Sequence, residues 1–239
     1  MNIILLDPAD WSDADHVTLK DHRHTHITRV LGATVGQQLR VGQINGSRGT
    51  GIITSLDKTG VSLRVTLSDA PTPRHPVTLI LALPRPKMLR RVFRTVAEFG
   101  VSELHLIHSY RVDKSYWQTP FLNESAIDIA LRAGLERACD TRLPVVQRHQ
   151  RFKPFIEDRL REIAGRHPCY LCQPGNYPAL PTALSSPATV VIGPEGGFIP
   201  FEVELAQQNG AQPAQLGQRI LSVDTAVTSV LAMTAAVAG

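Results

Sequence analysis

The sequence predicts an α/β protein in which a small β-barrel precedes a larger domain with a parallel sheet. Three observations lead to this prediction. Short apolar or alternating runs fill the first 70 residues, a proline-rich segment follows at residues 70–76, and strand and helix patterns then alternate. Strands that alternate with helices are typical of a parallel sheet covered on both faces. We therefore expect two domains, residues 1–72 and residues 73–239.

The first domain has the pattern of a small barrel. Its strand-like runs are short, and turn-forming residues such as Asn45-Gly46 separate them. A helical pattern precedes these runs, with Ile27, Val30 and Leu31 at helical spacing. The expected elements are a helix at 22–31 and strands at 39–42, 51–54 and 61–67.

Three histidines, His22, His24 and His26, open this helical pattern and could form a metal cluster. No carboxylate or cysteine stands at ligand spacing nearby. We therefore favour a polar helix start over a metal site, and we expect no metal in this protein.

The second domain begins after Pro71, Pro73 and Pro76, which can continue neither a strand ladder nor a helix. The apolar run that follows is of the kind buried on both faces of a parallel sheet. The predicted strands are residues 77–83, 101–107, 143–146, 168–173, 189–192 and 213–217. The predicted helices are residues 85–99, 123–135, 155–164, 202–210 and 225–237.

Composition indicates a globular protein of the cytoplasm. The chain has 239 residues, of which 43% are apolar. Its first residues lack a basic segment before the apolar run, and its last apolar stretch is too short to span a bilayer. Three cysteines do not suggest a disulfide framework. Cys169 and Cys172 form a C-x-x-C that could serve metal or redox chemistry, but the residues between them favour a buried strand.

The charge distribution favours a nucleic-acid partner. The net charge is only +4, but most basic residues are arginine, which suits phosphate and stacked bases. On the helix at 85–99 four cations share one face without interleaved acids, and a solvated face is the alternative. Tyr110, Tyr116 and Trp117 accompany cations in the loop at 108–122, which could hold unpaired bases or pack on a dimer partner. The cations of these two elements are Lys87, Arg90, Arg91, Arg94, Arg111 and Lys114.

Two glycine-bearing corners follow two strands near the end of the chain, at residues 193–197 and 217–219. The first corner lacks the lysine of a phosphate loop and the spacing of a dinucleotide fingerprint. Pro194 has no N–H to donate, and Glu195 would repel an anion. These features favour a neutral or cationic ligand such as an adenine-bearing molecule, although simple chain connections remain the alternative.

The same corners carry a family resemblance. Residues 192–198 (IGPEGGF) and 216–226 (LGQRILSVDTA) resemble the cofactor-binding end of the SPOUT methyltransferases. They are most similar to the bacterial 16S ribosomal RNA uridine N3-methyltransferase family, with its pattern IGPEGGF…LG-x-RILR-x-ETA. Residues 26–31 are similar to that family's HL-x-x-VLR, and residues 97–101 resemble its ELGV. The resemblance covers nearly the whole chain.

The resemblance implies a PUA-like RNA-binding barrel, then a trefoil-knotted domain that binds S-adenosyl-L-methionine and forms a homodimer. It implies methylation of N3 of a uridine in 16S ribosomal RNA, with Arg219 and Asp224 as candidate catalytic residues. The barrel would add Arg29 to the RNA-binding cations named above. The cofactor-binding residues implied are Ile192, Gly193, Pro194, Glu195, Gly196, Gly197, Leu216, Gly217, Ile220, Leu221, Ser222, Thr225 and Ala226.

The chain also departs from the family pattern. Ser222 replaces an arginine, Asp224 replaces a longer acid, and the expected E-Q-S-x-R stretch reads Glu-Arg-Ala-Cys-Asp, with Arg137 and Asp140. These departures bear on the substrate more than on the cofactor. Alternatives are a related SPOUT enzyme with another RNA target, or a non-catalytic RNA-binding protein with the same fold.

Overall fold

The computed structural model describes residues 1–235 and contains two compact units. One unit consists of Met1–Pro73 and Arg132–Leu143, and the other of Arg74–Leu131 and the chain from Pro144 onward. The later segment joins the first unit through an ion pair between Arg132 and Asp7 at 2.8 Å. Asn2 adds a hydrogen bond to the carbonyl of Arg137 at 2.9 Å.

The first unit is built on a five-stranded sheet in the order β1-β3-β4-β5-β2. Within residues 1–235, β1 and β2 form its two edges and do not pair with each other, so the predicted closed barrel is not established. Only β1 and β3 are parallel. Its core is aliphatic and includes Leu6, Val17 and Leu63. The strands are β1 (Ile4–Leu6), β2 (His16–Leu19), β3 (Gln38–Gln43), β4 (Arg48–Leu56) and β5 (Val61–Asp69).

The helix predicted at 22–31 is wrong in detail. The chain forms one α-helical turn, α1 (His22–Thr25), and continues as a π-helix, η2 (His26–Val30). The wider turn closes with a hydrogen bond from the Leu31 N–H to the His26 carbonyl at 3.0 Å. A short 3₁₀ helix, η1 (Pro8–Asp10), lies earlier in the same unit.

The second unit contains an entirely parallel six-stranded sheet in the order β11-β9-β10-β6-β7-β8. This confirms the predicted α/β fold with a parallel sheet. The central strands are buried, with every residue of β10 inaccessible. The strands are β6 (Val77–Ala82), β7 (Glu103–Ile107), β8 (Val145–His149), β9 (Cys169–Cys172), β10 (Ala188–Ile192) and β11 (Ala211–Ala214).

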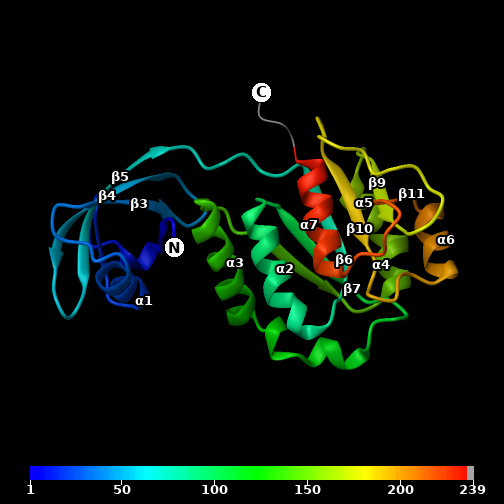
Figure 1. Cartoon of the computed structure of the whole chain (residues 1–239), viewed down its shortest axis with the longest axis horizontal. Coiled ribbons are helices and arrows are strands. Elements are labelled where there is room, and N and C mark those ends of the chain that lie inside the picture. The colour runs from blue at the N-terminus through cyan, green and yellow to red at the C-terminus, as the bar shows by residue number, and fades with distance from the viewer. Residues whose placement is uncertain (236–239) are drawn as a thin grey trace. The chain divides into compact units, whose positions relative to one another are not determined.

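Helices cover both faces of this sheet (Figure 1). The figure shows α2 and α7 side by side on one face, and α4, α5 and α6 on the other. The helix predicted at 225–237 is observed as α7, and residues 236–237 lie outside the described residues. The helices are α2 (Pro86–Glu98), α3 (Glu124–Ala138), α4 (Phe152–Asp158), α5 (Leu160–Ala164), α6 (Pro200–Gln208) and α7 (Val223–Thr234), with 3₁₀ helices η3 (Lys114–Gln118) and η4 (Pro120–Leu122).

The strand order creates a switch point between β6 and β10. From β6 the chain proceeds through α2 to β7 on one side, while from β10 it proceeds through α6 towards β11 on the other. In open α/β sheets ligands bind at such a point, beyond the carboxyl ends of the strands. Both glycine corners follow strands at this edge. None of the described helices is long and apolar enough to cross a membrane.

Candidate active site

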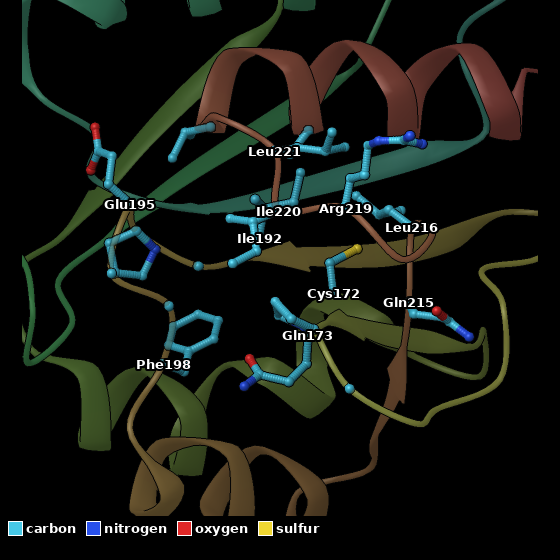
Figure 2. Close-up of a pocket in the computed structure, with 18 of the residues that line it drawn as sticks. Cys172, Gln173, Ile192, Glu195, Phe198, Gln215, Leu216, Arg219, Ile220 and Leu221 are labelled. Carbon is cyan, nitrogen blue, oxygen red and sulfur yellow. The ribbon is translucent and has the colours of Figure 1, made fainter.

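A cavity of about 500 Å³ opens at the carboxyl ends of β9, β10 and β11. Most of its wall comes from three segments, residues 172–175, 192–198 and 215–221, completed by Arg111, Val223 and Ala226. Figure 2 shows Cys172, Ile192 and Phe198 pointing into this space, with Glu195 at its far side. The size suits a small organic ligand.

The first corner is a tight turn that requires glycine. The Gly197 N–H donates to the Pro194 carbonyl at 2.8 Å, and Gly197 has a φ of 70°. A Cβ at Gly193 would lie 3.2 Å from the ring of Phe198, which is itself buried. The backbone of this corner therefore lines the cavity directly, without side chains that would fill it.

The buried carboxylate of Glu202 on α6 holds this corner in place. It accepts hydrogen bonds from the Ile199 N–H at 3.1 Å and the Tyr110 N–H at 2.8 Å. Both donors are backbone amides, so the acid joins the corner to the loop after β7. The sequence analysis did not single out Glu202, because an acid in the first turn of a helix has an ordinary structural explanation.

Glu195, at the tip of the corner, is tied to α2. Its carboxylate accepts the backbone N–H of Arg85 at 3.0 Å. Arg85 is the N-terminal cap residue of α2. The acid thus anchors a helix start as well as placing a negative group beside the cavity.

Arg111, one of the predicted RNA-binding cations, lies at the cavity. Its Nη1 donates to the Gly196 carbonyl, and a Cβ at Gly196 would lie 2.8 Å from the Arg111 Cδ. Because residue 196 is a glycine, the aliphatic part of the Arg111 side chain can pass close to the backbone of this corner.

The second corner is more open. Gly217 has a φ of 124°, a conformation that side chains disfavour. Gln218 and Arg219 are exposed, and Ile220 is 85% exposed although it lines the cavity. Such an exposed apolar side chain at a cavity mouth is suited to covering a bound ligand.

Residues after β9 form a third wall that the sequence analysis missed. Cys172, Gln173, Pro174 and Gly175 all line the cavity. The Gln173 Oε1 atom is buried, and within residues 1–235 it has no hydrogen-bond partner. A buried acceptor without a partner calls for an explanation, and a donor from water or from a ligand in the cavity would satisfy it. The sequence predicted a buried strand here and considered the C-x-x-C as a metal or redox motif, but it did not predict that the residues after the strand line a cavity.

The C-x-x-C is a buried structural pair. Cys169 and Cys172 are free thiols, and burial raises the pKa of each to about 12. They are therefore protonated and unreactive at neutral pH. The three histidines at 22–26 form no metal-ligand group either. In the described part of the chain, only Asp13, Asp15 and His16 come together as three potential ligands, and they lie at the surface.

The two candidate catalytic residues have different surroundings. Asp224 forms an ion pair with Arg91 at 2.6 Å and accepts the Ser222 hydroxyl at 2.6 Å. The Ser222 hydrogen bond, followed by that of Arg91, holds the pKa of Asp224 below its ordinary value. Arg219 instead lies exposed along the second corner, and its side chain runs beside α7 (Figure 2).

Several predicted residues lie outside the cavity wall. Ser222 and Thr225 are not lining residues, and their hydroxyls contact each other at 2.9 Å at the start of α7. Lys87, Arg90 and Lys114 are exposed, whereas Arg94 is half-buried. Arg29 is exposed on the π-helix of the first unit. Of the residues that depart from the family pattern, Asp140 is buried and accepts the Thr141 N–H at 2.7 Å.

A family model described as an RNA methyltransferase domain matches residues 70–235. The chain is also 30% identical, over 223 residues, to the ribosomal RNA small subunit methyltransferase E of Synechocystis sp.. That match covers 90% of this chain and 71% of the relative. The chain belongs to the RNA methyltransferase domain family. It is a methyltransferase, as the terminal motifs predicted.

Further comparisons agree with this membership in the RNA methyltransferase domain family. The ribosomal RNA small subunit methyltransferase E of Treponema pallidum is 28% identical over 242 residues, which cover 98% of this chain and 90% of the relative. A crystal structure of the Neisseria gonorrhoeae methyltransferase E bound to S-adenosyl methionine has a TM-score of 0.77 at 20% identity, covering 97% of this chain and 95% of that one. A Legionella pneumophila methyltransferase with bound cofactor has a TM-score of 0.72 at 21% identity, covering 96% and 95%. The fold is therefore that of these methyltransferases.

Proposed function

We propose that this protein transfers the methyl group of S-adenosyl-L-methionine to N3 of a uridine in 16S ribosomal RNA. The observation that carries the proposal is the cavity at the switch point, which two glycine corners wall. It holds a buried acceptor that has no partner among the described residues. The methyltransferase E relatives, named for ribosomal RNA of the small subunit, support the substrate. S-adenosyl methionine in the Neisseria gonorrhoeae structure supports the cofactor.

The cavity fits the parts of this cofactor. Ile192 and Leu216 supply apolar surface for a flat adenine ring, and the Gln173 Oε1 atom can accept from its amino group. Gly193 and Gly217 have no side chain, so their backbone can approach its edge closely. When bound, S-adenosyl-L-methionine supplies an electrophilic methyl group on a sulfonium. Glu195 and Arg111 would face its cationic and anionic groups, although Arg111 already holds the Gly196 carbonyl.

Arg219 is the proposed catalytic residue at the base. The N3 proton of uracil must pass to solvent water as N3 accepts the methyl group, and negative charge develops on the imide during this exchange. An exposed guanidinium on the second corner can stabilise that charge as it forms. The corners otherwise act by fixing the donor and acceptor in line.

Asp224 is a weaker candidate for proton acceptance. Its lowered pKa makes it a poor base at neutral pH, and its oxygens already bind Ser222 and Arg91. We assign it a positioning role, in which it holds Arg91 against the start of α7. Ser222 and Thr225 would support that start rather than touch the cofactor.

RNA would be held mainly by the cations of the second unit, with help from the first. The proposed contacts are Lys87, Arg90, Arg91, Arg94, Arg111 and Lys114, together with Arg29 of a PUA-like first unit. The proposal includes a trefoil knot in the second unit, a homodimer whose second chain completes the site, and a location in the cytoplasm. The small side chains of α7, such as Ala226 and Ser229, would pack closely in that dimer.

Mass spectrometry of ribosomal RNA tests this proposal. The enzyme is incubated with cofactor carrying a labelled methyl group and with small-subunit RNA from a strain that lacks the gene. We expect one labelled N3-methyluridine in 16S RNA. Label on another base or in another RNA would show that the proposed target is wrong. The absence of label with every RNA would favour a non-catalytic RNA-binding protein that retains the fold.

A further inference from the structure

A second pocket, of about 750 Å³, lies at the carboxyl ends of β7 and β8 in the second unit. We infer that it binds one unpaired nucleotide of the RNA substrate that flanks the methylated base, through a stack on Trp117 and a phosphate contact to Arg151. We call it the Trp117 pocket, after the residue at its mouth. This inference rests on the proposed function, since it names how the substrate of that activity is held.

The aromatic walls of the Trp117 pocket are held in fixed orientations. The Trp117 Nε1–H donates to the Nδ1 of His108 at 3.0 Å. Burial lowers the pKa of His108, so its ring is neutral and can accept this hydrogen bond. The indole is therefore oriented without a ligand, and its half-exposed face is available for stacking.

Two rings that line the pocket, His149 and Phe155, pack together with a third ring, His105. His149 lies with its ring centroid 4.5 Å from that of Phe155 and 5.4 Å from that of His105. Phe155 and His105 are buried. Burial, followed by the proximity of His105 and Arg159, lowers the pKa of His149 to about 4. His149 is therefore uncharged at neutral pH. A neutral aromatic surface of this kind is suited to packing against a nucleobase.

Three arginines line the pocket. Arg148 donates to the Leu122 carbonyl at 2.9 Å, and Arg159 pairs with Glu162 at 2.9 Å, so both are partly engaged. Arg151 is exposed between them in sequence and is the cation best placed to meet a phosphate. Asp158 is an acidic residue that also lines the pocket. Cations beside aromatic rings match an unpaired base with its phosphate.

Two elements connect the Trp117 pocket to the proposed cofactor cavity. The loop after β7 carries Arg111, which contacts Gly196 of that cavity, and further along it carries Trp117. On α4, Phe152 packs on Phe198 with ring centroids 5.8 Å apart, and Phe155 lines the Trp117 pocket. Both openings lie at the same edge of one parallel sheet. An RNA strand with its target base at the first opening can therefore reach the second.

Steady-state kinetics with 16S RNA test the inference in the full-length enzyme. We expect Trp117→Ala to raise KM for RNA about tenfold, the effect of losing one base stack. Arg151→Ala should weaken RNA binding and reduce the slope of log affinity against log salt by about 0.7, the value for one phosphate of a single strand. Neither variant should change the affinity for S-adenosyl-L-methionine, and Trp117→Phe should restore most of the RNA affinity.

The matched control is Arg166→Ala. Arg166 is an equally exposed arginine of the same unit, but it precedes β9 and so lies at the amino end of the sheet. It should leave both KM and the salt slope unchanged. If Trp117→Ala and Arg151→Ala leave KM unchanged and methylation is normal, the Trp117 pocket does not bind RNA. The proposed function would remain intact.

A photochemical experiment separates the pocket from the methylation target. A short single-stranded RNA that contains 5-iodouridine is irradiated with the enzyme in the absence of cofactor, and the crosslinked peptide is identified by mass spectrometry. We expect a crosslink at Trp117 even if the methylated nucleotide proves to be a different one. Crosslinks confined to other residues would overturn the inference. The oligomeric state of the Trp117→Ala variant is measured by sedimentation. A shift from dimer to monomer would show that Trp117 lies in an interface between two copies of the chain, and this result would also overturn the inference.

Discussion

The two openings at the carboxyl edge of the parallel sheet are built in different ways. Much of the proposed cofactor cavity is formed by two glycine corners, where glycine permits the turn and the close approach. The Trp117 pocket is formed by side chains from β8, α4 and the loop after β7. The lining of the first opening includes two arginines and one acid, and that of the second includes three arginines and one acid.

This difference matches two kinds of recognition. A small cofactor with a flat ring can be bound by backbone groups and apolar contact, so its site is encoded in short continuous motifs. RNA is bound by cations and aromatic rings, which can come from distant parts of the sequence as long as the fold brings them together. Substitutions should therefore separate catalysis, cofactor affinity and RNA affinity from one another.

The largest expected effect is on turnover. Arg219→Ala should lower kcat about 100-fold to 1000-fold, because it removes the charge that stabilises the developing imide anion. Arg219 also lines the cavity, so the affinity for S-adenosyl-L-methionine should fall as well, but by far less than kcat. Single-turnover methylation and calorimetry measure the two quantities. Equal losses in both would assign Arg219 to cofactor binding instead.

Gly217→Val should weaken cofactor affinity. Gly217 has a φ of 124°, and a β-branched residue there costs about 1–3 kcal/mol of strain or forces the second corner to move. We expect about tenfold to 100-fold weaker binding by calorimetry. Gly210→Val is the control, because Gly210 has a φ of 97° but follows α6, away from the cavity wall. It should lower the melting temperature and leave cofactor affinity unchanged.

Asp224→Asn tests whether this acid positions Arg91 or accepts the proton. Its pKa is lowered, so the carboxylate is already ionised near neutral pH and should add no inflection to the pH profile of kcat. We expect kcat to fall less than tenfold, against about 100-fold or more for loss of a general base. Arg91→Ala should give a similar loss, and the double variant no further loss. Arg90→Ala, one residue earlier on α2, should raise KM for RNA and leave kcat unchanged.

The smallest expected effect concerns His149, which lines the Trp117 pocket. The pKa of His149 is lowered from 6.5 to about 4, so the unfolded chain binds more protons than the folded chain between these values. Stability should therefore fall as the pH drops from about 6.5 towards 4, with the cost fully present below that pH. His149→Gln should reduce this acid sensitivity, measured as the change in melting temperature across that window. An unchanged acid sensitivity would show that His149 is not the group responsible.

The sequence predicted the cofactor side of the fold well, because its signals are local. The buried run at 189–192 became β10, and the glycine corner after it lines the cavity as expected. The strand predicted at 213–217 was displaced to β11 (Ala211–Ala214), because Ala211 pairs with Cys169 and the following residues turn into the cavity wall. Short apolar runs specify a strand but not its ends.

Contacts that join distant segments could not be predicted from the sequence. The cationic face of α2 was visible, but not that Arg91 pairs with an acid 133 residues later. Arg111 was grouped with RNA-binding cations, but its contact with Gly196 was not predicted. Gln173 had no signal at all, because a single amide after a strand becomes informative only when its buried oxygen lacks a partner in the described structure. The π-helix at His26–Val30 was likewise hidden within an ordinary helical pattern.

A calorimetric titration of S-adenosyl-L-methionine into the wild-type protein tests the central claim most directly. The claim is that the two glycine corners form the cofactor site. We predict saturable binding at one site per chain, weakened in Gly217→Val and unchanged in Trp117→Ala. No binding at millimolar cofactor, or binding that Gly217→Val leaves intact, would contradict it.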